Sequence, residues 1–177
     1  MFLDRDGTLI EDKGYTNKIK DLRFIEGVIE GLKLIQKLNY KLIIVTNQAG
    51  IGKGKYKEED YFSFRNEMHK NLREQGIFIT AEYFCPHHPD AVIEKYKIDC
   101  SCRKPKSGML EEAARDFNLD LTKCWMIGDK TSDILAGKNA KCKTIQVMTG
   151  EEKIKSSEAD FLVNNLLEAV KYLHLKQ

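Results

Sequence analysis

Two aspartates near the start of the chain have the residue type and the spacing of reacting carboxylates. They lie in Asp4-Arg5-Asp6-Gly7-Thr8, directly after the apolar run Met1-Phe2-Leu3, which reads as the end of a strand. Residues two apart on extended backbone point to the same side, so both carboxylates would face one small site. Their mutual repulsion favours a shared proton or a bound cation. A polar turn closed by Gly7 is the alternative that these five residues leave open.

Polar residues also stand at the ends of two other apolar runs, at Thr46 and at Asp129. The carboxyl ends of parallel strands meet at one edge of a sheet, and ligands bind outside that edge. Asp4, Asp6 and Asp129 would supply oxygen ligands there for a hard divalent cation, for which Mg²⁺ fits best. The sequence therefore predicts a magnesium site that can hold a phosphate.

A basic stretch, Arg103-Lys104-Pro105-Lys106, supplies the positive charge that a phosphoryl group attracts. One carboxylate of the early pair can attack phosphorus while the other delivers a proton to the leaving oxygen. Thr46 would offer the phosphoryl oxygens a neutral donor, Lys104 a point charge and Arg103 two parallel hydrogen bonds. Taken alone, the stretch is more typical of a solvated basic turn.

Three cysteines and two histidines gather between positions 85 and 102, in Cys85-Pro86-His87-His88-Pro89 and Cys100-Ser101-Cys102. In a chain that we expect to be cytoplasmic, such clustering favours metal binding over disulfides. Three thiolates and one imidazole complete a closed tetrahedral zinc site, so we expect structural zinc that pins this loop. His87 is the expected ligand by its spacing from Cys85, with His88 as the alternative. Two reduced cysteine clusters on a surface loop are the competing interpretation.

Helical and strand patterns alternate along the chain. Apolar residues recur at helical spacing in the segments 28–38, 58–74, 108–117, 134–140 and 166–173. Short apolar runs predict strands at 1–3, 42–45, 81–84, 124–127, 144–147 and 161–163. We therefore predict an α/β fold with a mainly parallel sheet that places the polar strand ends side by side.

The loops 11–17 and 50–55 and the short first strand each lead to a further prediction. The polar loop 11–17 would lie over the site at the carboxyl edge. The glycine-spaced basic loop 50–55 is either a weak phosphate cradle or a flexible turn with solvated lysines. The first strand would be unusually short, which we expect to affect the stability of a sheet edge more than the chemistry.

Length and composition limit the number of domains, the location and the partners that we expect. The chain has 177 residues, enough for a single domain over 1–177 that buries a core without disulfides. With 42% hydrophobic and 32% charged residues and no apolar run of bilayer length, we expect a cytoplasmic protein without a membrane partner. The 29 Lys and Arg nearly balance the 27 Asp and Glu, which argues against nucleic-acid binding. We expect a monomer, with Cys124 and Cys142 as buried thiols.

In order and spacing, four signals resemble the four motifs of the haloacid dehalogenase superfamily: Asp4-Arg5-Asp6-Gly7-Thr8, Thr46, the lysine of Arg103-Lys104-Pro105, and Gly128-Asp129 with Asp133. The resemblance implies a Rossmann-like three-layer sandwich without a separate cap domain. It implies that Asp4 forms an aspartyl-phosphate and that Asp6 is the general acid and then the base that activates water. Thr46 and Lys104 would hold the phosphoryl group, and Asp129 would help to bind Mg²⁺. The second aspartate resembles the phosphatase branch, since dehalogenases lack it.

The zinc loop narrows this resemblance to one family. Cys-Pro-His-His-Pro followed by Cys-x-Cys-Arg-Lys-Pro is similar to the D-glycero-D-manno-heptose 1,7-bisphosphate 7-phosphatases, whereas the related histidinol-phosphate phosphatases have a shorter interval. The resemblance implies a phosphorylated sugar substrate, Mg²⁺ and Zn²⁺ as cofactors, and a place in nucleotide-activated heptose synthesis. It also implies substrate contacts from Asp12, Lys13, Gly14, Tyr15, Thr46, Asn47, Gln48, Ala49, Arg103, Lys104 and Lys130.

Two other functions stay open from the sequence. The first keeps the chemistry but takes histidinol phosphate or another small phosphomonoester as substrate. The second is a zinc-binding module without catalysis, against which the complete set of motif residues argues. A polynucleotide phosphatase shares the opening motif, but the chain lacks the basic groove that such a substrate needs.

Overall fold

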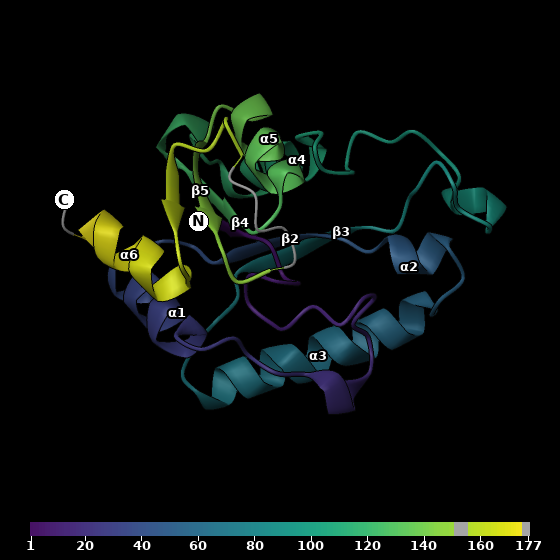
Figure 1. The fold of residues 1–177 in the computed structure, drawn as a ribbon, viewed down its shortest axis with the longest axis horizontal. Helices are drawn as coiled ribbons and strands as arrows, with labels where there is room; N and C mark the ends of the chain where they lie inside the picture. The colour runs from purple at the N-terminus through teal and green to yellow at the C-terminus, as the bar shows by residue number, and fades with distance from the viewer. Residues whose placement is uncertain (151–155, 175–177) are drawn as a thin grey trace.

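The computed structural model describes residues 1–150 and 156–174, and a six-stranded sheet forms its centre (Figure 1). The strand order is β3-β2-β1-β4-β5-β6, and all five pairings are parallel. The strands are β1 (Phe2–Leu3), β2 (Ile43–Asn47), β3 (Ala81–Cys85), β4 (Trp125–Gly128), β5 (Lys143–Val147) and β6 (Phe161–Val163). The six predicted strands are confirmed, each to within two residues at either end.

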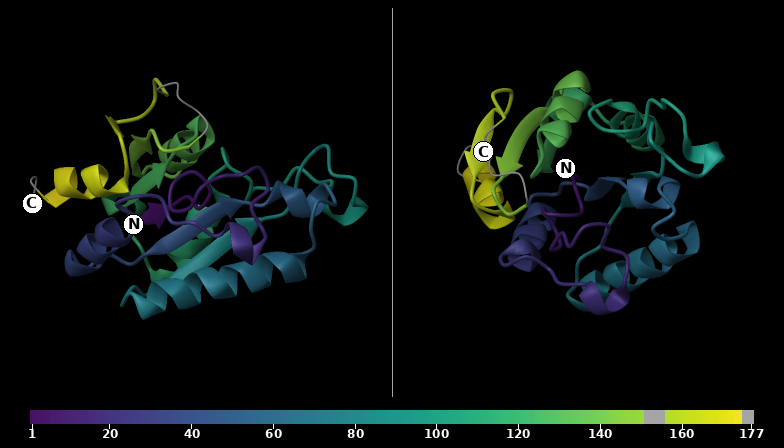
Figure 2. Two further views of the ribbon diagram at one scale, coloured as in Figure 1. Left: turned by 60° about the horizontal axis from the view of Figure 1, so that its bottom comes forward. Right: turned by 45° about the vertical axis from the view of Figure 1, so that its right-hand side comes forward.

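Helices cover both faces of the sheet, with α1 and α3 on one side and α4 and α5 on the other (Figures 1 and 2). The longer helices are α1 (Val28–Lys37), α3 (Glu58–Glu74), α4 (Gly108–Phe117), α5 (Thr131–Asn139) and α6 (Leu166–His174). Shorter elements are α2 (Ala49–Gly52), η1 (Ile19–Asp21), η2 (Glu94–Tyr96) and η3 (Leu121–Lys123). Helix α5 starts three residues earlier than its apolar pattern predicted, because the Asp133 carboxylate accepts the N–H of Lys130 at 3.0 Å and caps a polar first turn.

Successive strand residues contribute to two separate cores. Leu3 and Ile44 are fully buried in the core beneath α1, α3 and α6, whereas Phe2 and Ile43 are fully buried in the core beneath α4 and α5. Burial on both faces is typical of the central strands of a parallel sheet. The three-layer sandwich is thus confirmed, and every strand of the described residues belongs to its one sheet.

Strand β1 is the shortest strand and lies at the centre of the sheet, between β2 and β4. The amino group of Met1 donates to the carbonyl of Lys41 at 2.9 Å, and the N–H of Asp4 donates to the carbonyl of Ile127 at 2.9 Å. The expectation that the short first strand weakens a sheet edge is wrong, because neighbouring strands pair with it on both sides.

The glycine-spaced segment after β2 is shaped by close packing. Its first residues form α2, in which Gly50 and Gly52 are buried. A Cβ atom on Gly52 would lie 2.6 Å from the carbonyl of Pro86, and one on Gly50 would lie 2.2 Å from the ring of Tyr56. The flexible-turn interpretation is therefore wrong for this part of the loop. Because Gly52 and Gly50 have no side chain, residue Pro86 and the ring of Tyr56 can lie closer to the backbone of α2 than a larger residue would allow.

The zinc loop, residues 85–102, extends from the end of β3 past α2 (Figures 1 and 2). Its η2 turn packs on α2, and the N–H groups of Val92 and Ile93 donate to the carbonyl of Gly52 at 3.0 and 3.1 Å. Across residues 1–150 and 156–174, no helix has the length and apolar character to cross a membrane.

Candidate active site

Three aspartates and one lysine meet at the carboxyl edge of the sheet. Asp4 follows β1, Asp129 follows β4 and Asp133 lies in the first turn of α5. One carboxylate oxygen from each lies within 4.8 Å of the others, and we call these three residues the acidic cluster. Lys104 Nζ donates to Asp4 Oδ1 at 2.5 Å, lies 2.7 Å from Asp133 Oδ1 and donates to the carbonyl of Val45 at 2.8 Å. The three aspartates and Lys104 are at most 6% exposed.

The acidic cluster carries more negative charge than Lys104 can neutralise. Burial raises the pKa of Asp4, and the Lys104 ammonium opposes that rise. Burial together with the charges of Asp4 and Asp133 raises the pKa of Asp129 to about 8. Asp129 Oδ2 is buried and has no hydrogen-bond partner among the described residues. Three converging carboxylates with an unpaired oxygen fit a divalent cation, which would supply the missing positive charge.

The Asp6 carboxylate lies outside the acidic cluster. Arg5 Nε and Nη2 donate to Asp6 Oδ2 and Oδ1 at 3.0 and 2.9 Å, and Gln48 Nε2 donates to Asp6 Oδ2 at 3.1 Å. Burial raises the pKa of Asp6, and the Arg5 guanidinium opposes the rise. The structure groups Asp133, and not Asp6, with Asp4 and Asp129. The role of Asp6 as a magnesium ligand stays a prediction.

Two residues of β2 organise the side of the site that contains Lys104. Asn47 Nδ2 donates to the carbonyl of Lys104 at 3.0 Å, and the N–H of Lys104 donates to Asn47 Oδ1 at 3.1 Å, so the amide holds this backbone at two points. Lys104 is therefore buried and not part of a solvated turn. Thr46 Oγ1 accepts a hydrogen bond from Gln48 Nε2 at 2.8 Å, which leaves the Thr46 hydroxyl proton for a phosphoryl oxygen.

A pocket of about 440 Å³ opens next to these residues. Eight of the predicted substrate residues line it, namely Asp12, Gly14, Tyr15, Asn47, Gln48, Ala49, Arg103 and Lys130. Lys130 Nζ donates to Asp12 Oδ2 at 3.0 Å, and Arg103 Nη1 donates to the carbonyl of His87 at 3.2 Å. Burial alone would lower the pKa of Lys130, but Asp12 and the acidic cluster raise it, so the side chain is a cation. Lys13 is outside this lining, with its ammonium 3.7 Å from Glu11 on the surface.

The pocket also contains residues that the sequence did not single out, namely Arg5, Thr16, Tyr56 and Ser132. Arg5 could have been predicted from the sequence, because a charged residue at the end of a buried strand requires a counter-ion. It is 1% exposed and lies over the ring of Phe64 at 4.9 Å. Tyr56 has no recognisable pattern in the sequence, since its contact with Gln48 spans α2 and depends on the path of the chain after that helix.

Four predicted zinc ligands converge where the zinc loop closes on itself. Cys102 Sγ lies 3.1 Å from both Cys85 Sγ and Cys100 Sγ, and His87 Nδ1 lies 3.4 Å from Cys102 Sγ. Hydrogen bonds from the neighbouring thiols lower the pKa of Cys102 to about 5, and the same contacts raise the pKa of Cys85. Three thiols and one imidazole with donor atoms within 4.8 Å of one another are a donor set that suits tetrahedral zinc. His88 lies outside the cluster, where its Nδ1 accepts a backbone N–H at 3.0 Å.

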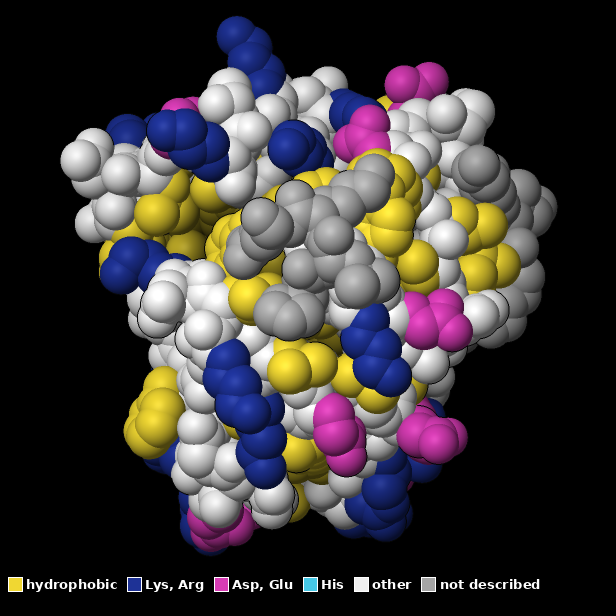
Figure 3. All heavy atoms as spheres, turned by 90° about the vertical axis from the view of Figure 1, so that its left-hand side faces the viewer, with side chains coloured by type: hydrophobic (Ala, Val, Ile, Leu, Met, Phe, Trp, Pro, Cys, Tyr) yellow, Lys and Arg dark blue, Asp and Glu magenta, His cyan; other side chains and the backbone are white. Residues whose placement is uncertain are grey.

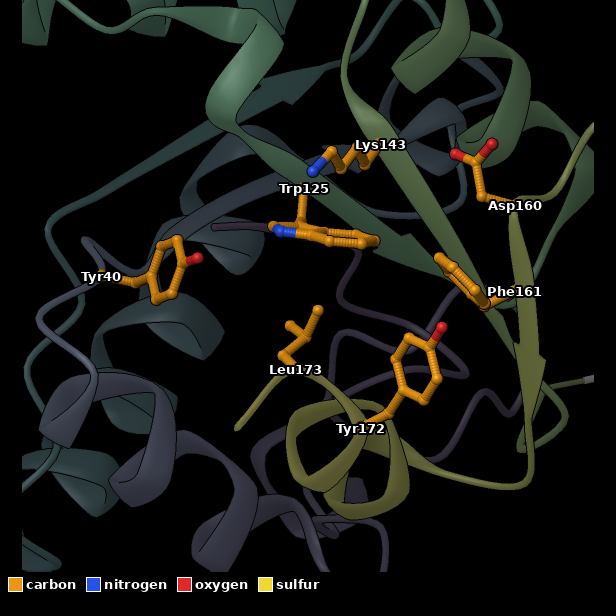
Figure 4. Close-up of a pocket in the computed structure, with 7 residues that line it drawn as sticks. All are labelled: Tyr40, Trp125, Lys143, Asp160, Phe161, Tyr172 and Leu173. Carbon is orange, nitrogen blue, oxygen red and sulfur yellow. The ribbon is translucent and has the colours of Figure 1, made fainter. Parts of the chain in front are cut away.

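A second hollow of about 460 Å³ lies at the opposite, amino edge of the sheet (Figure 4). Its lining consists of Tyr40, Trp125, Lys143, Asp160, Phe161, Tyr172 and Leu173. Its charged groups are engaged, with Lys143 Nζ 5.3 Å from the ring centre of Trp125 and Asp160 accepting the N–H of Thr144 at 2.8 Å. At the end of the molecule where α1 and α6 lie, hydrophobic side chains are interspersed with lysine and arginine (Figure 3). None of the predicted site residues lines this hollow.

Comparison with known proteins agrees with the fold. The HAD-hydrolase-like family model matches residues 101–169. A solved D,D-heptose 1,7-bisphosphate phosphatase from B. bronchiseptica, complexed with magnesium and phosphate, matches with a TM-score of 0.89 at 24% identity. The match covers 100% of this chain and 98% of that chain. Both matches show a HAD-like hydrolase fold.

Two relatives from Photorhabdus laumondii narrow the class. One, a D-glycero-beta-D-manno-heptose-1,7-bisphosphate 7-phosphatase, is 42% identical over 174 residues, which are 97% of this chain and 93% of the relative. The other, a D-glycero-alpha-D-manno-heptose-1,7-bisphosphate 7-phosphatase, is 39% identical over 173 residues, 97% of this chain and 94% of the relative. The chain belongs to the D-glycero-D-manno-heptose-1,7-bisphosphate 7-phosphatase family.

Proposed function

We propose that the chain removes the 7-phosphate of D-glycero-D-manno-heptose 1,7-bisphosphate in nucleotide-activated heptose synthesis. One observation carries the proposal: besides Arg5, which is paired with Asp6, the pocket beside the acidic cluster contains the cations Arg103 and Lys130. A monophosphate needs only the donors next to Asp4, whereas a bisphosphate would place its second phosphate against Arg103 and Lys130. Family membership supports the heptose as the sugar.

In the proposed reaction, a carboxylate oxygen of Asp4 attacks phosphorus, the bond from phosphorus to the sugar oxygen breaks, and the proton of Asp6 passes to that oxygen. Water then attacks the aspartyl-phosphate and gives a proton to Asp6, which releases inorganic phosphate and restores the Asp4 carboxylate. Lys104 lies 2.5 Å from Asp4 and would balance charge on the phosphoryl oxygens, together with the hydroxyl of Thr46.

Two metals fit the residues at the site. Asp4, Asp129 and Asp133 would hold Mg²⁺, which when bound would neutralise charge on the phosphate and on the nucleophile. Cys85, His87, Cys100 and Cys102 would hold structural zinc. The contact of Arg103 with the carbonyl of His87 ties this phosphate-binding side chain to the zinc loop.

A substrate panel tests the proposal. We expect the highest kcat/KM for one anomer of the heptose 1,7-bisphosphate, lower values for histidinol phosphate and an aryl phosphate, and no turnover by Asp4→Asn. Both anomers belong in the panel because relatives are named for each. A strong preference for histidinol phosphate would reject the proposed substrate. Activity retained by Asp4→Asn would reject the covalent mechanism.

The remaining expectations stay predictions: one domain over 1–177, a monomer in the cytoplasm, and no nucleic-acid or membrane partner. The near balance of 29 basic and 27 acidic residues supports the absence of a nucleic-acid partner. Sedimentation of the purified protein would measure its oligomeric state.

A further inference from the structure

Gln48 lies between two residues that act on the substrate in the proposed reaction. Its Nε2 donates to Asp6 Oδ2 at 3.1 Å and to Thr46 Oγ1 at 2.8 Å. Its Oε1 accepts from the Tyr56 hydroxyl at 2.5 Å and from Arg5 Nη2 at 3.3 Å. The side chain is buried, and these contacts use both hydrogens of the amide nitrogen and both lone pairs of the oxygen. We call these five residues the Gln48 network.

An amide with this set of partners has no hydrogen bond left for a substrate, although Gln48 lines the pocket. Turning toward a ligand would leave the buried hydroxyl of Tyr56 without its partner, and unpaired buried groups are unfavourable. We propose that Gln48 is a positioning residue and not a substrate contact. It aims the Asp6 carboxylate at the leaving oxygen and the Thr46 hydroxyl at the phosphoryl group, and this inference rests on the proposed function.

Arg5 and Tyr56 fix the direction in which the amide points. The Arg5 guanidinium has only donors, so it can donate to the oxygen of Gln48 but cannot hydrogen-bond with the amide nitrogen. The same guanidinium holds Asp6 through two hydrogen bonds. A flipped amide would therefore set its oxygen against the Asp6 carboxylate and its nitrogen against Arg5. The observed direction is the one that serves both neighbours.

Tyr56 is the second residue that holds the Gln48 amide in its observed direction. The ring is 7% exposed and sits where Gly50 has no side chain, since a Cβ atom there would lie 2.2 Å from the ring. The Tyr56 hydroxyl makes the shortest hydrogen bond of the network to Gln48. A Tyr56→Phe substitution removes this hydroxyl and leaves the packing of the ring intact. The effect of the substitution on activity therefore measures how much the direction of the Gln48 amide matters.

Two variants separate positioning from substrate binding. Gln48→Glu keeps the size and an acceptor oxygen for Arg5 and Tyr56, but it cannot donate to Asp6 or Thr46. Tyr56→Phe removes one hydroxyl. The matched control is Tyr83→Phe, which removes a hydroxyl that donates to Asp116 at 2.5 Å on the surface. Each protein is assayed with the heptose bisphosphate and with p-nitrophenyl phosphate, and its fold is checked by circular dichroism and urea unfolding.

We expect kcat to fall about 100-fold for Gln48→Glu, as for a mispositioned general acid, and about tenfold for Tyr56→Phe. The fall should be equal on both substrates, with KM within about twofold of wild type, and Tyr83→Phe should leave both constants unchanged. A positioning residue affects every phosphomonoester alike, because Asp6 and Thr46 act on the group that all of them share.

A higher KM for the heptose bisphosphate with unchanged kcat on both substrates would overturn the inference and make Gln48 a substrate contact. If Gln48→Glu does not fold, Tyr56→Phe decides, and unchanged kcat on both substrates overturns the inference. Wild-type activity on p-nitrophenyl phosphate without activity on the heptose bisphosphate would reject the proposed substrate, while the variants would still test positioning on the aryl phosphate.

Discussion

Replacement of Asp129 by asparagine should stabilise the magnesium-free protein and at the same time abolish its response to Mg²⁺. Asp129 is fully buried, and its Oδ2 has no partner among residues 1–150 and 156–174. Burial and the charges of Asp4 and Asp133 raise its pKa to about 8. Asparagine has nearly the same shape but cannot ionise, so the substitution removes the free-energy cost of keeping this carboxyl protonated in the fold and changes the packing little.

The size of the effect follows from the pKa of Asp129. In the unfolded chain the carboxyl ionises near pH 3.8, so between that pH and about 8 the folded protein keeps a proton that the unfolded chain has lost. The free energy of unfolding therefore falls as the pH rises through this window. At 1.36 kcal/mol per pH unit, the loss reaches about 4 kcal/mol at pH 7. Asp129→Asn should recover up to this amount at pH 7 and nothing near pH 4.

Urea unfolding followed by the fluorescence of Trp125, the one tryptophan, measures this difference. The buffer should lack Mg²⁺ but contain no chelator, so that zinc bound at the proposed site in residues 85–102 is retained. Asp160→Asn is the control of opposite sign: burial opposes ionisation, but hydrogen bonds from Lys138 and Thr144 lower the pKa of Asp160, so this variant should lose stability at pH 7.

Mg²⁺ then provides the second half of the test. Wild type should gain stability on addition of Mg²⁺, because a cation that binds only the folded state shifts the equilibrium toward it, whereas Asp129→Asn should not respond. The reasoning would be refuted by a magnesium-free Asp129→Asn protein less stable than wild type at pH 7, or by an equal response of both proteins to Mg²⁺.

Two further predictions concern the cations of the site. Lys104→Met removes the ammonium that contacts Asp4 and Asp133, so urea unfolding at pH 8 should show a loss of about 3–5 kcal/mol without Mg²⁺, and a smaller loss at pH 5. An equal loss at both pH values would contradict this electrostatic origin. Protein purified without chelator should contain zinc, and its removal should speed amide exchange in residues 85–102 while Mg²⁺ still binds. Metal analysis should find that Cys102→Ser loses zinc. Cys124→Ser should keep it, since Cys124 is a buried thiol outside the group of predicted zinc ligands. Absence of zinc from the wild-type protein would contradict the assignment.

The strand patterns in the sequence were sufficient to predict the sheet and the edge at which the site residues lie. Asp4, Thr46 and Asp129 each follow an apolar run, and such runs become strands because burial favours extended, β-branched segments between two helical layers. Once the strands are parallel, their carboxyl ends share one edge, whatever the loops do. The Cys and His spacing likewise predicted a donor set that the structure brings within 4.8 Å.

Only the tertiary structure decided which side chains share a partner. Asp6 follows Asp4 by two residues, yet Arg5 and Gln48 hold its carboxylate, and Asp133 joins the acidic cluster from the first turn of α5. Tyr56 meets Gln48 across α2, eight residues further along the chain. Sequence spacing predicts the period and the order of elements, but a buried polar group takes whichever partner the folded loops bring within hydrogen-bond distance.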